Sequence, residues 1–411
     1  MALQIGQMRA ENQRNWDAYV KSHPMGNIYQ LSGWKTVIEG TYNHHAYYLL
    51  AAYPLDDEAS AAMRLSAAAA TDDDGRGAKG RRPHPANTDA GSIGGSYRNS
   101  PQIAGVLPLV HLKSIVFGNS LISMPFCDMG GVLADTDQIK RALILEAIKI
   151  GERLGVGRIE LRSPKNQTIL FGENGKQDPR TDSHLSRCWA ALTTSDKVRM
   201  VLKLPESTEA LSKSFKSKLR SQIKKPMKEG LTSRIGQTEL LDDFYRVFVE
   251  NMKDLGSPVH SKGLFRNILK EFPAHSRIIM VYAGKIPTAG GVVLQYKDTV
   301  MNPWASSLKS YKRLSPNMLL YWAMLAHACD HGYRFFDFGR CTPNEGTYKF
   351  KEQWGAEPEP LISSFFSPDV DFAKKPIAEN KILKLGSEVW KKLPLFSTRI
   401  VGPIIRKNID L

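Results

Sequence analysis

One order of segments occurs twice along this sequence, and it limits the folds that the chain can adopt. In each half, several strand-like segments precede one predicted helix, and a further strand follows that helix. Strands interleaved with helices of this length favour a mixed sheet covered by helices, so we expect an α+β fold. The segments span 46–53, 103–110, 119–126, 136–154 and 157–162 in the first half, and 276–282, 289–296, 299–306, 315–332 and 333–338 in the second.

The chain of 411 residues is too long for one ordinary core and predicts two domains. We expect an N-terminal domain at 1–205, a basic connecting helix at 206–230 and a C-terminal domain with the active site at 231–375. A basic amphipathic tail follows at 376–411. Inside the first domain, residues 56–100 are rich in Ala, Gly, Asp and Arg and offer few side chains to bury. This composition predicts a disordered insertion between two strands.

The charge balance favours an anionic partner. The sequence contains 56 Lys and Arg against 41 Asp and Glu, a formal net charge of +15. Nucleic acid, a phosphorylated intermediate and a membrane surface all fit this charge. The N-terminus lacks the apolar core of a signal peptide, and no run of 18 apolar residues occurs. We therefore expect a cytoplasmic protein that is at most peripheral at the inner membrane.

Metal and disulfide sites have little support in the sequence. Four cysteines without a C-x-x-C pair indicate neither a disulfide framework nor a zinc site. His327 and His331 lie four residues apart on the apolar helix, but histidines in a last helical turn more often complement the helix dipole. We expect no metal. The motifs of α/β-hydrolases, P-loop NTPases and Rossmann dehydrogenases are absent, which leaves transfer chemistry or binding.

A basic segment, 213–228, carries seven basic residues and no acidic one. An apolar residue recurs at every fourth position, which predicts a helix with an apolar back and a basic front. The apolar residues are Leu211, Phe215, Leu219 and Ile223. The basic front is either a solvated surface or a face on which an anionic substrate or RNA lies. The candidate ligand contacts on it are Lys216, Lys218 and Arg220.

A second basic segment, 309–317, runs into the predicted start of the apolar helix at Ser315. Free backbone amides and the positive end of the helix dipole attract a phosphate or carboxylate at such a place. Three cations just upstream, Lys309, Lys312 and Arg313, strengthen this attraction. The alternative is a capped helix with exposed basic side chains.

Asp337 lies inside an aromatic predicted strand, where a carboxylate needs a cationic partner. Arg340 is the nearest cation in the sequence. Because neighbouring strand residues point to opposite faces, Lys349 or Lys351 is an equally suitable partner.

The segment 347–351 alternates aromatic and basic residues, and we expect it to be extended. Tyr348 and Phe350 would then face one side, and the two lysines would face the other. A lysine ammonium in a cleft can stabilise the oxyanion that acyl transfer to an amine produces. An exposed cation is the alternative for each lysine.

The C-terminal segment 381–411 mixes seven basic and two acidic residues with Leu, Trp, Phe and Ile. Such a segment could lie on an anionic membrane surface. It could equally pack an apolar face on the body of the protein. The residues of that face are Ile382, Leu385, Val389 and Trp390.

Several segments together resemble the FemAB-like branch of the GNAT superfamily. In the second half they are SKSFKSKLRSQIKKPMKEG, AGGVVLQYKDTVMNPWASS, YKRLSPNMLLYWAMLAHACDHG and FFDFGRCTPNEGTYKFKEQWGAEP, in which GTYKFKEQWG is the most specific part. In the first half they are YQLSGWKTVIE, IAGVLPLVHLKS and CDMGGVL. The resemblance extends to a subgroup encoded with exosortase and PEP-CTERM exopolysaccharide systems, whose members also end in a tail like WKKLPL.

The resemblance implies two GNAT-like domains in tandem and transfer of an acyl or aminoacyl group to an amine. The acceptor would be an anionic precursor of the cell envelope, such as peptidoglycan, or of an exopolysaccharide. The family's Phe-Lys pair falls on Phe350 and Lys351, where the lysine would stabilise the tetrahedral intermediate. Asp337 or Tyr348 would orient groups or relay a proton.

The resemblance also implies substrate-binding residues. The family's phosphate-holding cations fall on Lys35, which follows Trp34, and on Lys218 or Arg220. Trp304 and Arg340 complete the predicted substrate-binding set.

The resemblance leaves two acyl donors open and implies no tightly bound cofactor. Aminoacyl-tRNA is the donor of the Fem ligases, although this sequence lacks a long heptad segment for their coiled-coil arm. Acyl-CoA is the donor of other GNAT enzymes, although the loop KSYKRLSPN lacks the glycines of their pyrophosphate loop. The alternatives are therefore a CoA-dependent N-acyltransferase acting on an amino sugar or amino acid, and a non-catalytic basic scaffold at the membrane in polysaccharide assembly.

Overall fold

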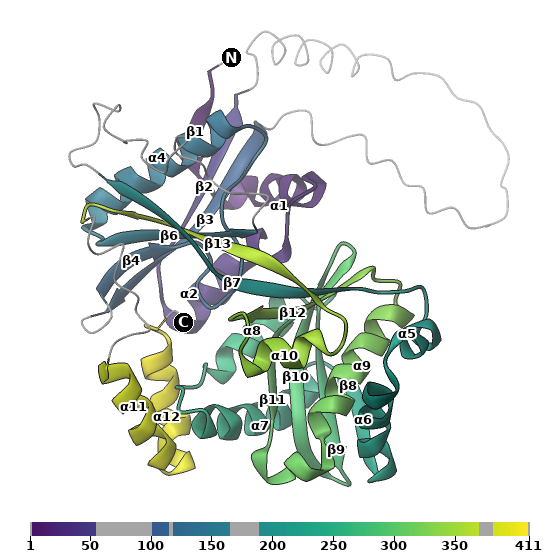
Figure 1. Ribbon diagram of the computed structural model, residues 1–411. Coiled ribbons are helices and arrows are strands. Elements are labelled where there is room, and N and C mark those ends of the chain that lie inside the picture. Colours follow the sequence, from purple (N-terminus) through teal and green to yellow (C-terminus); the bar gives the residue numbers. More distant parts are fainter. Residues whose placement is uncertain (1, 55–100, 115–117, 165–188, 370–380, 410–411) are drawn as a thin grey trace, which may run out of the picture.

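The computed structural model describes residues 2–54, 101–114, 118–164, 189–369 and 381–409. The predicted insertion at 56–100 lies outside these residues. Within them, 13 strands form one mixed, mostly antiparallel sheet covered by helices, so the predicted α+β class is confirmed (Figure 1). The strands follow the order β1-β2-β3-β4-β6-β13-β7-β12-β11-β10-β9-β8, and β5 pairs with β3 beside this path.

The first half of the chain contains a parallel strand pair, β4 with β6. Helix α4 (Asp137–Leu154) connects these strands, because parallel neighbours need a crossover. Thr136 caps the start of α4 by accepting a hydrogen bond from the Ile139 amide, and Gly155 ends it in the left-handed conformation. The other elements of this half are β1 (Gln4–Gln7), η1 (Ala10–Asn12), α1 (Gln13–Ser22), η2 (Ile28–Gln30), α2 (Gly33–Tyr42), β2 (Ala46–Tyr53), β3 (Gln102–Ser114), β4 (Gly118–Ile122), β5 (Leu133–Ala134) and β6 (Arg158–Pro164).

The second half repeats this arrangement with the parallel pair of β11 and β12. Helix α9 (Pro316–Asp330) connects them and begins with proline, which suits a first helical turn because its missing amide hydrogen would have no partner there. The other elements are β8 (Leu231–Gly236), η5 (Thr238–Leu240), α7 (Leu241–Asp254), α8 (Lys262–Glu271), β9 (Ser276–Ala283), β10 (Ile286–Tyr296), β11 (Thr299–Ser307), η6 (Lys309–Leu314) and β12 (Phe335–Cys341).

Two strands, β7 (Ala190–Lys203) and β13 (Glu357–Ser367), join the halves (Figure 1). Strand β7 follows β6 along the chain but pairs with β12 of the second half. Strand β13 follows β12 but pairs with β6 of the first half, and β7 and β13 also pair with each other. Each half thus receives its last strand from the other.

The predicted single helix at 206–230 is corrected to two, α5 (Thr208–Ser214) and α6 (Ser217–Lys228). Phe215 between them has an extended backbone, and its ring meets Trp322 and Trp354 edge-on. The buried position of the Phe215 ring goes together with the interruption of the predicted helix between Ser214 and Ser217. The predicted apolar back is confirmed by the burial of Leu211, Phe215, Leu219 and Ile223.

The predicted extended segment at 347–351 is wrong, because it lies in helix α10 (Gly346–Glu352). The rings of Phe350 and Trp354 both contact Tyr321 of α9, with centroid distances of 5.0 and 6.3 Å. In an extended chain, residues four apart would be separated by about 13 Å, too far to share one partner ring. Packing on α9 therefore favours the helix.

The tail forms α11 (Lys381–Lys392) and α12 (Leu395–Arg406), which lie against α7 (Figure 1). Packing on the body is confirmed for Trp390, which is buried, and is wrong for Val389, which is 54% exposed. Ile382 and Leu385 lie outside the residues whose side chains are described. In the described ranges, every helix is too short or too polar to cross a bilayer.

Candidate active site

The candidate site lies where strands β11 and β12 stop pairing. Their parallel ladder matches 299–301 with 335–337 and ends there. Strand β12 then has a bulge against β7, and Gly339 adopts a φ of 78° inside it. A side chain at this position would meet the Asn302 carbonyl oxygen at 3.1 Å, so glycine suits both the backbone conformation and the close approach. Because of the bulge, the polar groups of residues 337–340 face different hydrogen-bond and ionic partners.

Lys351 projects from α10 into this bulge and is 7% exposed. Its Nζ donates hydrogen bonds to the carbonyl oxygens of Gly339, at 2.8 Å, and Arg340, at 3.0 Å. Burial lowers the pKa of the Lys351 ammonium, while the negative charges of Asp128 and Asp337 raise it. The result is a dry ammonium group held in one place by main-chain oxygens.

Asp337 is 3% exposed and accepts a hydrogen bond from the Gly339 amide at 2.8 Å. Its ionic partner is Arg199 of β7, whose Nη1 lies 3.4 Å from Oδ2. The predicted partners, Arg340 and Lys349, are corrected, and Lys351 acts on Asp337 only through its charge. Burial raises the pKa of the Asp337 carboxyl, and Arg199 opposes this rise.

Arg340 points to the other side of the bulge. Its amide donates to Asp128 Oδ2 at 3.1 Å, and its Nε lies 3.5 Å from Oδ1. Asp128 belongs to the first half of the chain, whereas Arg340 belongs to the second. The charges of the candidate site therefore come from both halves.

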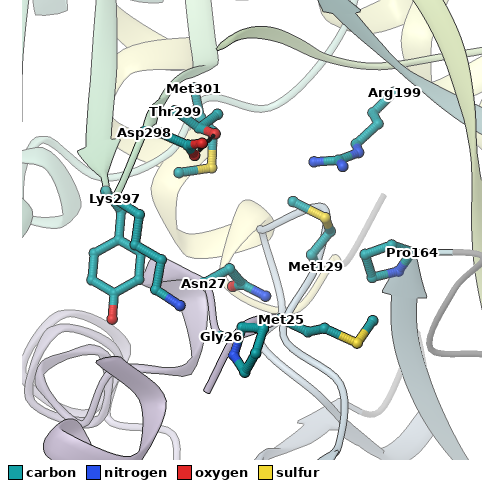
Figure 2. Close-up of a pocket in the computed structure, with 12 residues that line it drawn as sticks. Met25, Gly26, Asn27, Met129, Pro164, Arg199, Lys297, Asp298, Thr299 and Met301 are labelled. Carbon is teal, nitrogen blue, oxygen red and sulfur yellow. Dashed lines mark hydrogen bonds between the residues drawn. The ribbon is translucent and has the colours of Figure 1, made fainter. Parts of the chain in front are cut away.

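A cavity of about 220 Å³ adjoins this network between the two halves. Arg199 borders both the cavity and Asp337. Figure 2 shows the Arg199 guanidinium directed into the cavity from the side opposite Lys297 and Asp298, with Asn27 between them. The cavity thus has cationic and hydrogen-bonding walls, and it meets the buried network at Arg199.

The other two predicted site residues of α10 pack on the core of the second half. Phe350 and Tyr348 are half-buried on the core of the second half. The Phe350 ring packs edge-on against Tyr321, and Tyr321 stacks on Phe338 at 5.6 Å. These contacts fix the helix that carries Lys351.

Trp34 and Trp304 are packing residues in this structure, since they are 0% and 7% exposed. The Trp34 ring lies 5.4 Å from Phe272, and the Trp304 ring lies 5.3 Å from Phe265. Such burial does not fit direct contact with a ligand. Lys35 forms an ion pair with Glu39 on its own helix.

The remaining predicted cations lie apart from the Lys351 network. Arg220 donates hydrogen bonds to the carbonyl oxygens of Phe215 and, at 3.5 Å, Lys213, so it caps the end of α5. The others are exposed on α6 and η6: Lys216, Lys218, Lys309, Lys312 and Arg313. They offer a basic surface rather than a closed pocket.

The histidine pair on α9 has protein partners. His327 Nε2 lies 2.7 Å from Gln295 Nε2, and His331 Nδ1 lies 2.8 Å from the His327 carbonyl oxygen. Among the described residues, no cluster of three or more His, Cys, Asp or Glu side chains has the geometry of a metal site.

The sequence does not predict three residues of this charged network, Asp128, Arg199 and Glu359. Arg199 Nε donates to Glu359 Oε2 at 2.9 Å, which extends the network to β13. The sequence signal for Arg199 is a charged residue between two apolar ones, Val198 and Met200, which are both buried in β7. Asp128 and Glu359 gave no such signal, because only the strand exchange brings them near.

Comparison with known proteins agrees with this geometry. Residues 213–352 match the sequence profile of the acetyltransferase (GNAT) domain. Among curated proteins, none matches the sequence. The matched region, 213–352, ends just after Lys351, so it includes Lys351 and both strands β11 and β12.

Solved structures resemble nearly the whole chain. The crystal structure of FemX has a TM-score of 0.56 at 14% identity, covering 88% of this chain and 96% of its own. A protein of unknown function from Bacteroides thetaiotaomicron VPI-5482 has a TM-score of 0.51 at 8% identity, with 89% and 100% covered. A tandem GNAT protein from the clavulanic acid biosynthesis pathway has a TM-score of 0.49 at 9% identity, with 90% and 99% covered.

The two halves of the chain repeat one arrangement of strands and a connecting helix. The second half matches the GNAT domain, and the first half repeats its order of antiparallel strands, connecting helix and parallel strand. Residues 213–352 in the second half thus match the acetyltransferase (GNAT) domain, and the fold of the whole chain is similar to that of FemX.

Proposed function

We propose that this protein transfers an acyl or aminoacyl group to an amine of an anionic cell-envelope or exopolysaccharide precursor. The observation that carries the proposal is the buried Lys351 ammonium, held by two carbonyl oxygens where β11 and β12 stop pairing. In acyl transfer, negative charge develops on the carbonyl oxygen of the donor. A preorganised cation in a dry site stabilises that charge strongly.

The reaction needs one bond formed, one broken and one proton moved. The amine nitrogen attacks the carbonyl carbon of an activated ester or thioester, and the carbonyl oxygen becomes an oxyanion beside Lys351. The oxyanion then collapses, the C–O or C–S bond breaks, and the amine proton leaves. Asp337 suits the role of proton acceptor, because burial raises the pKa of its carboxyl and makes the carboxylate a stronger base. Tyr348, on the same helix as Lys351, is the alternative relay.

The basic surfaces support an anionic acceptor. Arg199 and Lys297 line the cavity beside the network, and the cations of α6 and η6 are exposed. Phosphate groups of a nucleotide- or lipid-linked precursor are suited to such surfaces. The cell-envelope or exopolysaccharide class rests on the resemblance of the sequence.

The conformation of η6 bears on the donor. This loop precedes α9 and forms a 3₁₀ helix, in which the Tyr311 amide bonds to the Leu308 carbonyl and the Ser315 amide to that of Lys312. Amides used in this way are not free to cradle the pyrophosphate of CoA. We therefore propose aminoacyl-tRNA as the donor and acyl-CoA as the alternative.

Substitution of Lys351 tests the catalytic proposal. We expect Lys351→Met to reduce transfer of a labelled aminoacyl group from tRNA to amine acceptors in an envelope extract by about 100-fold or more. Lys349→Met is the matched control, because Lys349 is exposed on the same helix, and we expect it to leave transfer within about twofold. Circular dichroism confirms that each variant is folded. Undiminished transfer by folded Lys351→Met would remove the proposed role.

Calorimetry distinguishes the donors. Titration of the full chain with CoA and, separately, with aminoacyl-tRNA should give binding of tRNA and none of CoA. Binding of CoA alone would replace the aminoacyl donor by acyl-CoA. Binding of neither would count against both.

A further inference from the structure

Helix α12 presents an apolar outer face to solvent. Phe396, Ile400 and Ile404 recur at every fourth position and are 73%, 51% and 59% exposed. Leu395 and Val401 beside them are each 41% exposed. We call these five residues the tail face. Five large apolar side chains exposed on one short helix are more than a soluble surface usually leaves uncovered, and Phe396, Ile400 and Ile404 follow one line along it.

The inner side of α12 is fixed on the body, so the tail face cannot turn inward. Thr398 is 1% exposed, and a side chain on Gly402 would lie 2.8 Å from the Val259 side chain. Arg406 Nε donates to His260 Nε2 at 3.1 Å in the interior. The helix therefore has a closely packed inner side and an apolar outer side. Figure 1 places it at the edge of the molecule beside α7.

The charges within the segment that contains the tail face are all positive. Residues 389–409 contain no acidic residue and five basic ones, namely Lys391, Lys392, Arg399, Arg406 and Lys407. Lys392 and Arg399 are exposed, and among the described residues neither takes part in an ion pair. Arg399 interacts electrostatically with Asp242, and Lys392 with Glu388, but the ammonium and guanidinium groups both stay open to solvent. An apolar helix face with exposed cations nearby has the chemistry of a helix that lies in the interface of an anionic bilayer.

We propose that the tail face docks this protein on an anionic lipid surface, with Phe396, Ile400 and Ile404 inserted among the lipids and Lys392 and Arg399 near the headgroups. A second copy of the chain fits this face less well. In a symmetric dimer formed through this face, Lys392 and Arg399 of one copy would lie near the same cations of the other copy. Repulsion between these like charges disfavours such a dimer. This docking does not depend on the proposed acyl transfer, because the tail face contains none of the residues placed in the active site.

Vesicle binding tests the apolar part of the proposal. The full chain should bind vesicles of phosphatidylcholine mixed with phosphatidylglycerol more tightly than vesicles of phosphatidylcholine alone, and salt should weaken this binding. The triple variant Phe396→Ser/Ile400→Ser/Ile404→Ser should bind about tenfold or more weakly. The matched control is Met227→Ser/Ile235→Ser/Ile286→Ser, which removes three apolar side chains that are 43%, 41% and 50% exposed elsewhere. This control should bind as the unaltered protein does.

Charge reversal tests the cationic part of the proposal. Lys392→Glu/Arg399→Glu should weaken binding to the anionic vesicles and leave any binding to pure phosphatidylcholine unchanged. Lys21→Glu/Lys285→Glu changes the charge equally at exposed sites away from the tail and should retain binding. Thermal unfolding shows that each variant is folded.

Three results would overturn the proposal. The first is failure of the full chain to bind anionic vesicles. The second is binding that the apolar triple variant leaves unchanged. The third is self-association, seen by sedimentation velocity, that the triple variant abolishes while no vesicle binding occurs.

Discussion

At the scale of single residues, the candidate site depends on charges that are buried and paired across the two halves. Asp337 would be costly inside the protein without Arg199, and Arg199 in turn is held by Glu359. Lys351 has carbonyl oxygens in place of a close carboxylate. These pairings keep ammonium and carboxylate near each other without a direct ion pair that would neutralise both.

Arg199 should therefore stabilise the ionised form of Asp337. In Arg199→Met, the pKa of Asp337 should rise further, because the opposing cation is gone. The pKa of the Asp337 carboxyl is higher in the folded protein than its unfolded value of 3.8. The group therefore stabilises the fold at pH values below 3.8, and this stabilisation is lost as the pH rises through the folded pKa. The variant should thus lose about 3 kcal/mol of unfolding free energy at pH 7 and less at pH 4.

Denaturant unfolding at the two pH values measures this difference. Arg199→Lys keeps the charge and should recover part of the loss. Arg234→Met, on the exposed face of edge strand β8, controls for removal of an arginine. An equal loss at pH 4 and pH 7 would mean that Arg199 acts through packing instead of charge.

His260 predicts a second pH effect, of opposite sign. It is 2% exposed, and burial together with the Arg406 charge lowers the pKa of His260 well below its ordinary value of 6.5. The folded protein keeps this ring neutral, whereas the unfolded chain takes up a proton below pH 6.5. The stabilisation is therefore complete above pH 6.5 and is lost as pH falls, with a limiting slope of about 1.4 kcal/mol per pH unit.

His260→Gln should flatten this slope between pH 6.5 and pH 5, as measured by denaturant unfolding. The exposed His45 provides the control, and His45→Gln should keep the slope of the unaltered protein. If His260→Gln and His45→Gln show the same slope of unfolding free energy against pH, the prediction is wrong. The comparison is made on slopes, because the substitution also removes the contacts of His260 with Tyr42 and Arg406.

At the scale of elements, local patterns predicted the secondary structure well. Strand β2 has the predicted bounds, 46–53, and α4 begins one residue after the predicted start at 136. Strong periodicity and clear end signals explain this success. In the segment of α10 the alternation of aromatic and basic residues predicts a strand, but the segment is a helix. Contacts with Tyr321, which is distant in sequence, decide between the two.

The candidate site was less predictable than the elements, for the same physical reason. The sequence points to Lys351 and Asp337 as candidates because a lysine beside aromatics and a carboxylate among phenylalanines are unusual within one short segment. The partner of Asp337, Arg199, lies 138 residues away in the sequence, and the partner of Arg340, Asp128, lies 212 residues away. Trp34 and Trp304 are predicted to contact a ligand and instead are buried, since an aromatic residue in a core and one in a pocket have the same local sequence signal.

At the scale of the whole molecule, the exchange of β7 and β13 makes one body of two repeated halves. The strands pair with each other and with both halves, so the sheet has no break at its centre. Phe366 illustrates the consequence. It follows the second half in sequence, yet it is 1% exposed in the core of the first half, together with Leu49, Leu107 and Ile159.

This architecture predicts a single unfolding transition, and core substitutions in either half should shift it. Phe366→Ala affects the first core and Phe336→Ala the second, where Phe336 is 0% exposed. Each should lower the free energy of unfolding by about 3–5 kcal/mol, because a buried ring leaves a cavity. Differential scanning calorimetry should show the same single peak moved to lower temperature in both variants. If Phe336→Ala instead moves one of two peaks and leaves the other in place, the halves unfold independently and the exchanged strands do not couple them.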